Sequence, residues 1–146
     1  MRSLVLYAPN VHTGGGLVLL RALLANWPAN GPKLTLFLDS RALDVLPLPE
    51  RCRVFWVEAT VASRLLAEFQ LSRQVAEDDG IVFCFHGLPP ILPNKGKVVV
   101  YLHNRNYLVF NSLPGFSWKT QIRLTFERLV GRIFRSRVSS YIVQSP

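Results

Sequence analysis

Apolar runs alternate with helical stretches along the chain. The runs, rich in Val, Leu, Ile and Phe, have the nearly continuous apolar character of strands that are buried on both faces of a parallel sheet. They lie at residues 3–8, 33–39, 53–57, 81–85, 98–102 and 139–143. Between the first two runs, Gly16–Trp27 is rich in Leu and Ala and is apolar nearly all round. This stretch predicts a buried helix.

Two further stretches predict helices. In Thr60–Glu77 the apolar residues mostly follow a helical period of about 3.6 residues. They are Val61, Leu65, Leu66, Phe69, Val75 and Ala76. The other stretch is Ser117–Arg137, where Ser117 is a suitable N-cap. The Pro-rich segment His86–Lys97 and the polar, aromatic segment 103–116 predict loops.

The alternation of strands and helices predicts an α/β fold with a doubly wound, Rossmann-like parallel sheet. We expect the strand order 3-2-1-4-5-6 in a single domain that spans residues 1–146. In sheets of this class, ligands bind in the crevice at the carboxyl ends of the strands.

Charge is concentrated at the end of the chain. The net charge is +8, and residues 101–146 carry seven basic side chains against one acidic residue, Glu127. Such a basic region indicates an anionic partner. No predicted helix is a convincing membrane span, since Gly16–Trp27 is too short. We therefore expect a cytoplasmic protein, either free or peripheral on the cytoplasmic face of the membrane.

The two cysteines, Cys52 and Cys84, lie in apolar strand-like runs without the spacing of a metal site or a redox pair. We expect both to be reduced core residues. The histidine spacing does not require a zinc site either, and no paired carboxylates of a hydrolase are visible. We therefore expect neither a metal nor a cofactor.

Polar residues gather where predicted strands end. Asn10, His12, Thr13 and the run Gly14–Gly16 follow the first strand, and His86 follows the fourth. The fifth is followed by His103, Asn104, Arg105 and Asn106. Because parallel strands end at one edge, we expect the three histidines to lie along that edge. The glycines would let a ligand approach a helix amino end. The alternative is a tight turn that needs one or two glycines for positive φ.

The last predicted helix combines an apolar stripe with basic residues on both sides. The stripe is Trp118, Ile122, Phe126, Leu129 and Ile133. The flanking residues are Lys119, Arg123, Arg128, Arg132 and Arg135. One interpretation is a packed helix with a solvated basic face. The other is attraction to anionic lipid head groups. Nucleic acid is not expected, because no binding motif accompanies the charge.

Three segments resemble a known family. Tyr7–Leu24 is similar to the first strand, glycine-rich loop and first helix of GT-B glycosyltransferases, in particular the retaining, nucleotide-sugar-dependent enzymes of bacterial polysaccharide synthesis. Asp79–His103 resembles the fourth strand, Pro-rich loop and fifth strand, which ends in histidine, and Tyr141–Pro146 resembles the strand after the last helix of the N-terminal half.

The resemblance implies the acceptor-side domain of a hexosyltransferase. The donor-binding domain, with its paired glutamates, would be absent from this chain, and we expect the chain alone to be inactive. The resemblance places Gly15 and Gly16 near the donor phosphates and the acceptor, and His103, the implied catalytic residue, near the transferred sugar. Arg105 and Asn106 would belong to the pocket beyond His103, and Asn10 and His12 are further candidates for substrate binding. Chemistry in this group needs no metal.

Two alternatives to the glycosyltransferase hypothesis stay open. The first is a non-catalytic α/β module that binds a membrane or a partner through its basic helix. The second is another doubly wound nucleotide-binding enzyme, such as an oxidoreductase. The glycine run matches neither G-x-G-x-x-G nor a phosphate-binding GK[ST] loop, which counts against the second.

Overall fold

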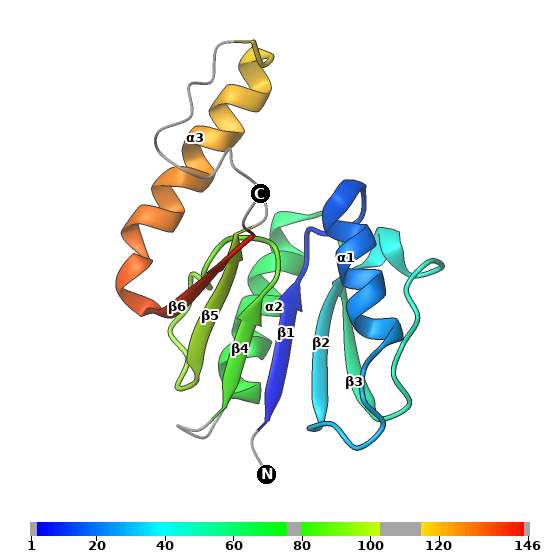
Figure 1. Ribbon diagram of the computed structural model, residues 1–146. Coiled ribbons are helices and arrows are strands. Elements are labelled where there is room, and N and C mark those ends of the chain that lie inside the picture. Colours follow the sequence, from blue (N-terminus) through cyan, green and yellow to red (C-terminus); the bar gives the residue numbers. More distant parts are fainter. Residues whose placement is uncertain (1–2, 76–79, 103–114, 145–146) are drawn as a thin grey trace.

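The computed structural model describes residues 3–75, 80–102 and 115–144. Six parallel strands form one sheet in the order β3-β2-β1-β4-β5-β6. Figure 1 shows the sheet with its helices. The strands are β1 (Leu4–Ala8), β2 (Leu34–Asp39), β3 (Cys52–Val57), β4 (Ile81–Cys84), β5 (Lys97–Leu102) and β6 (Val138–Val143). The predicted fold class and strand order are therefore confirmed.

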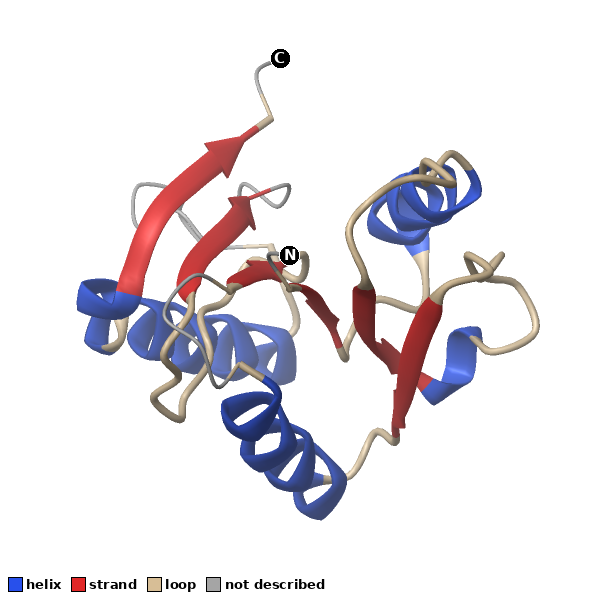
Figure 2. Ribbon diagram, turned by 90° about the horizontal axis from the view of Figure 1, so that it is seen from below, coloured by secondary structure: helices blue, strands red, loops and turns tan. Residues whose placement is uncertain are grey.

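Helices cover both faces of the sheet. Helix α1 (Gly14–Ala25) lies on one face, and α2 (Val61–Gln74) and α3 (Trp118–Ile133) lie on the other (Figure 2). Two short 3-10 turns complete the described elements, η1 (Ser40–Ala42) and η3 (Arg135–Arg137). The chain runs outward from β1 to β3 and then returns through α2 to β4, on the other side of β1. The strand order thus reverses between β1 and β4.

The core has two layers, one on each side of the sheet. Beneath α2, buried residues such as Val5, Phe37 and Val82 pack with Leu71. Beneath α1, Leu6, Leu36 and Phe85 are among the residues that pack with Leu20 and Leu24. Alternate residues of β1 and β2 enter opposite layers, and both layers are apolar. This explains the nearly continuous apolar runs in the sequence.

Two helices turn out differently from their sequence patterns. Helix α1 is not buried all round, because Gly16, Leu20 and Leu24 form its buried side while Val18 is 66% exposed. In α2 the buried residues are Ala67, Glu68 and Leu71. Four apolar residues of the predicted pattern are exposed instead, namely Val61, Leu65, Leu66 and Phe69. The period identified the helix correctly but did not identify the face that packs.

Helix α3 begins as predicted and ends earlier. The hydroxyl of Ser117 accepts a hydrogen bond from the backbone N–H of Thr120, which confirms Ser117 as the N-cap. The α-helix ends at Ile133 rather than Arg137, and η3 follows it. Both cysteines are free. Cys84 is fully buried, which raises the pKa of its thiol, and Cys52 is half-buried.

Candidate functional site

The site lies where the carboxyl ends of β1 and β4 meet, at the reversal of strand order. In doubly wound sheets this position opens a crevice for ligands. The carbonyl oxygen of Tyr7 accepts a hydrogen bond from the backbone N–H of Phe85 at 2.9 Å, which extends the pairing of the two strands beyond β4. Nδ1 of His86 lies 3.2 Å from the same oxygen, and its ring packs edge-on against the Tyr7 ring. His86 is thus held at this edge by β1.

Helix α1 directs its amino end toward the same edge. Thr13, its N-cap residue, makes no side-chain capping bond, and the first turn holds no acidic residue. The first backbone N–H groups of a helix have no acceptor within the helix, and the helix dipole adds partial positive charge there. This end of α1 therefore remains able to bind an anion.

The glycines of this turn serve different purposes. Gly14 has φ +68°, a conformation that favours glycine, so the turn itself explains this residue. Gly15 has no positive φ, and a Cβ atom added there would meet nothing within 4 Å. Gly15 is exposed, whereas Gly16 is buried. Neither the backbone nor packing requires glycine at position 15, and the missing side chain leaves the helix end uncovered.

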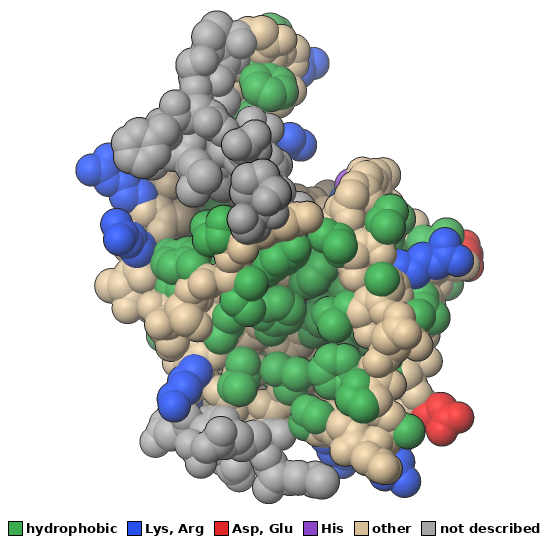
Figure 3. Space-filling view, viewed as in Figure 1, with side chains coloured by type: hydrophobic (Ala, Val, Ile, Leu, Met, Phe, Trp, Pro, Cys, Tyr) green, Lys and Arg blue, Asp and Glu red, His purple; other side chains and the backbone are tan. Residues whose placement is uncertain are grey.

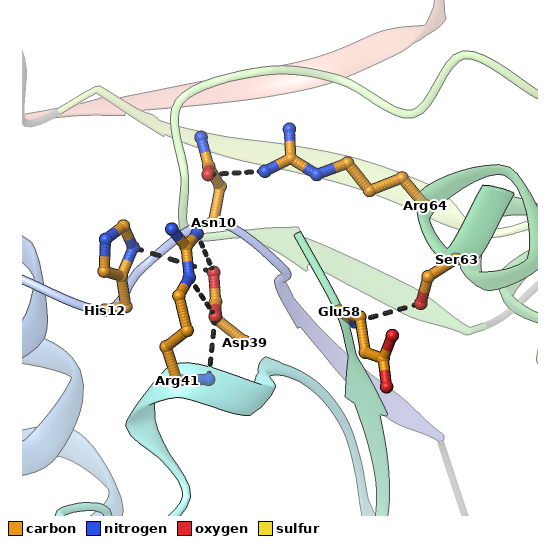
Figure 4. A network of polar contacts seen from close by, with 7 residues as sticks. All are labelled: Asn10, His12, Asp39, Arg41, Glu58, Ser63 and Arg64. Atoms are coloured by element: carbon orange, nitrogen blue, oxygen red, sulfur yellow. Dashed lines mark hydrogen bonds and ion pairs between the residues drawn. The ribbon is translucent and has the colours of Figure 1, made fainter. Parts of the chain in front are cut away.

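A buried carboxylate lies beside this turn. Asp39, the last residue of β2, is completely buried and forms two hydrogen bonds with the guanidinium of Arg41, from Nε to Oδ1 at 2.9 Å and from Nη2 to Oδ2 at 2.6 Å. The backbone N–H of Arg41 also donates to Oδ1. Nδ1 of His12 lies 3.6 Å from Oδ2, so the imidazole faces the carboxylate just beyond hydrogen-bond distance (Figure 4).

Two opposing influences set the pKa of Asp39. Burial is the largest and favours the protonated form. The hydrogen bonds and the charge of Arg41 outweigh it, so the pKa lies below its ordinary value. Asp39 is therefore a carboxylate at neutral pH, and Arg41 neutralises it.

A second arginine reaches the edge from α2. Nη2 of Arg64 donates to Oδ1 of Asn10 at 2.8 Å, which joins α2 to the loop after β1 (Figure 4). The Asn10 amide is neutral, so this bond leaves the charge of Arg64 uncompensated. Glu58 is an exposed acidic residue that follows β3, two strands away from β1. Its backbone N–H donates a hydrogen bond to the Ser63 hydroxyl.

A second buried carboxylate, Glu68, lies on the packed side of α2. Oε1 of Glu68 accepts a hydrogen bond from the Tyr7 hydroxyl at 2.9 Å. Oε2 accepts from the backbone N–H groups of Ile91 and Leu92, at 3.0 and 3.2 Å. Burial raises the pKa of Glu68 and prevails over these bonds and the charge of Arg137, which favour ionisation. Glu68 thereby joins β1, α2 and the loop between β4 and β5.

Several of the predicted site residues lie at this edge. The structure brings Asn10, His12, Gly15 and Gly16 to one edge, and His86 lies at the end of the adjacent strand. His103, Arg105 and Asn106 lie outside the described residues, so their roles stay predictions. Asp39 was recognisable only as the end of a strand. No sequence pattern pointed to Arg41, Arg64 or Glu68 as site residues. The partners of Arg64 and Glu68 lie on other elements, and the contact of Arg41 depends on the local turn.

The described residues contain neither a metal-binding cluster nor a membrane-spanning helix. No group of three or more His, Cys, Asp or Glu side chains in residues 3–75, 80–102 and 115–144 could hold a metal ion. Within these ranges, no helix combines the length and apolar character needed to cross a bilayer.

Comparison with known proteins gave no relative. No protein-family model matches the chain, and neither a curated protein nor a solved structure matches it. The geometry of the sheet edge and the resemblance of its motifs therefore remain as the indications of function.

Proposed function

We propose that the chain is the acceptor-side domain of a GT-B glycosyltransferase, which transfers a sugar from a nucleotide-sugar donor to a glycan or a lipid-linked acceptor in polysaccharide or envelope biosynthesis. The observation that carries the proposal is Gly15. Its φ is not positive, the space beyond it is empty, and it lies at the amino end of α1, on the side of the sheet where the strands end. A glycine that neither the turn nor the packing requires is explained by a ligand that approaches the backbone closely.

The charges at this edge favour a diphosphate as that ligand. The amino end of α1 supplies N–H donors and partial positive charge. Arg64, whose bond to Asn10 is to a neutral acceptor, adds a full positive charge. Asp39 does not oppose an anion strongly, because it is completely buried and paired with Arg41. In the proposed enzyme these groups contact the diphosphate of the donor.

His12 has a separate role in the proposal. Its Nδ1 faces the Asp39 carboxylate at 3.6 Å, which favours the tautomer with the proton on Nδ1. Nε2 then remains an acceptor, suited to a sugar hydroxyl. As the resemblance implies, the second domain would supply most groups around the departing nucleotide, and transition-state stabilisation needs those groups. We therefore propose that residues 1–146 contribute substrate binding to the enzyme.

A binding experiment tests the proposal at Gly15. Protein labelled with ¹⁵N-glycine is titrated with UDP, GDP, ADP and their sugar derivatives, and the amide shifts of Gly14–Gly16 are followed. A matched pair of variants, Gly15→Asp and Gly15→Asn, places similar side chains in the empty space. The carboxylate of Gly15→Asp favours the helix but repels a diphosphate. We expect this variant to bind at least about tenfold more weakly than Gly15→Asn, or about 1.4 kcal/mol, with no loss of folding stability.

Two results would contradict the proposal. One is that none of the nucleotides shifts an α1 glycine amide. The other is equal affinity of Gly15→Asp and Gly15→Asn, which would place the ligand away from α1. In either case the non-catalytic module becomes the better interpretation. The exposed stripe of α3 favours that second candidate.

A further inference from the structure

Helix α3 has two apolar faces, and only one of them packs. Leu124 and Val130 are buried, and on that side Gly131 lies near Leu88 of the loop between β4 and β5. The other apolar residues form a stripe that is 52–66% exposed, made of Trp118, Ile122, Phe126, Leu129 and Ile133. Each residue turns the helix by about 100° around its axis. The centre of the stripe therefore lies roughly 160° around the helix from the packed side. The sequence left open whether this stripe packs, and the structure exposes it.

Basic side chains border the stripe on both sides. On the same helical geometry, Lys119 and Arg123 fall on one side and Arg132 falls on the other, with Arg128 and Arg135 further round. Lys119, Arg123 and Arg132 are all exposed. Figure 3 shows Lys and Arg side chains on both sides of the part of the molecule formed by α3.

Acidic residues are nearly absent from this face. Glu127 is the single acidic residue in 115–144, and its side chain is only 12% exposed, on the packed side of the helix. It lies 3.9 Å from Arg123, whose side chain is 66% exposed. The outward face of α3 is therefore apolar along its centre and positive along both borders.

We infer that α3 docks on an anionic lipid bilayer, with its axis in the plane of the interface. The stripe enters the boundary between head groups and acyl chains, and Lys119, Arg123 and Arg132 contact the lipid phosphates. This occupant fits the arrangement because a bilayer presents an apolar layer beneath a continuous sheet of negative charge. A second copy of this chain would instead bring like charges together along both borders. The inference does not depend on the proposed function, since α3 shares no residue with the α1 site.

The apolar part is tested with co-sedimentation on vesicles of phosphatidylcholine alone or with a quarter phosphatidylglycerol. The double variant Ile122→Ser/Phe126→Ser removes two exposed stripe residues. Its control is Val61→Ser/Leu65→Ser on α2, whose side chains are 76% and 54% exposed. We expect wild-type protein and the control to bind the anionic vesicles, and the α3 variant to bind at least tenfold more weakly. Circular dichroism confirms that each variant is folded.

The basic part is tested with a matched change of charge. Lys119→Gln/Arg123→Gln/Arg132→Gln removes three positive charges from α3. A control set, Lys33→Gln/Arg51→Gln/Lys95→Gln, removes three exposed charges elsewhere. Binding should weaken at least tenfold for the α3 set only, and wild-type binding should weaken as salt rises.

Three outcomes would overturn the inference. Equal binding to neutral and anionic vesicles would exclude the basic borders as the source of selectivity. Equal losses in the α3 variants and their controls would exclude α3 as the docking element. If Ile122→Ser/Phe126→Ser converts a dimer to a monomer and wild-type protein binds no vesicles, a second copy covers the stripe.

Discussion

Asp39 and Glu68 are the two charged side chains that are buried in the described part of the chain, and their environments have opposite effects on them. Asp39 lies at the carboxyl edge of the sheet with a guanidinium on both of its oxygens, and its pKa is lowered. Glu68 lies on the buried side of α2 with three neutral donors, and its pKa is raised. Burial opposes ionisation at both positions, so the charge of the partner decides the outcome.

The two carboxylates also differ in what they hold together. Asp39 organises residues of its own turn and faces His12, so its effect is local to the carboxyl edge of the sheet. Glu68 joins Tyr7 to Ile91 and Leu92, which are 61, 23 and 24 residues away along the chain. The carbonyl of Ile91 in turn accepts a hydrogen bond from Arg137, just before β6. Glu68 thus connects the centre of the sheet to the elements at its β6 edge.

The largest expected effect is at Glu68. Glu68→Ala leaves the Tyr7 hydroxyl and two backbone N–H groups without their acceptor, and unsatisfied buried groups cost about 1–3 kcal/mol each. Because Ile91 is 40% exposed and water can reach it, we expect a total loss of about 3 kcal/mol, which urea unfolding would measure.

Two variants sharpen this prediction. Glu68→Gln retains an acceptor and should lose about 1 kcal/mol. Glu58→Ala removes an exposed carboxylate and should change stability by less than about 0.5 kcal/mol. Equal losses for Glu68→Ala and Glu58→Ala would show that the buried network contributes nothing.

A smaller effect is expected at the Asp39 pair, where the two partners are unequally exposed. Arg41→Gln leaves a completely buried carboxylate without its cation and should cost about 2 kcal/mol. Asp39→Asn leaves a guanidinium whose side chain is already 42% exposed and can turn into water, so about 1 kcal/mol is expected. Urea unfolding of both variants at pH 7 measures the difference. The opposite ranking would mean that burial of Asp39 does not control the cost.

The smallest effect is in the pH dependence, where the two carboxylates should act with opposite signs. Asp39 has a lowered folded pKa, so its contribution is present above its unfolded pKa of about 3.9 and is lost as pH falls through the folded value. Glu68 has a raised folded pKa. The folded state therefore binds its proton more tightly, and stability falls as pH rises from about 4.3 through the folded value.

Variants separate the two contributions. Unfolding free energies are measured from pH 3 to 8 for the wild type, Asp39→Asn and Glu68→Gln. Relative to the wild type, Glu68→Gln should become more stable as pH rises above about 4.3, and Asp39→Asn should become less stable as pH rises toward about 3.9. Parallel curves for the two variants would show that their environments do not differ in the way the contacts indicate.

The sequence by itself determined the elements and their order. A strand buried on both faces must be apolar at nearly every position, and this local requirement is visible at β1, β2 and β4. The N-cap at Ser117 was equally predictable, because its bond to Thr120 spans three residues. Right-handed crossovers then left few arrangements for the sheet, and the order β3-β2-β1-β4-β5-β6 followed.

Only the tertiary structure decided which side of each helix packs and which polar groups meet. Helical period does not distinguish a packed side from an exposed one when apolar residues occur on both, as in α2 and α3. Glu68 is buried because Tyr7 and the loop after β4 supply its donors, and Arg64 reaches Asn10 across 54 residues of sequence. Polar partners of this kind depend on distances that the folded chain alone sets. Residue spacing therefore indicated which residues follow the strand ends but could not show the contacts among them.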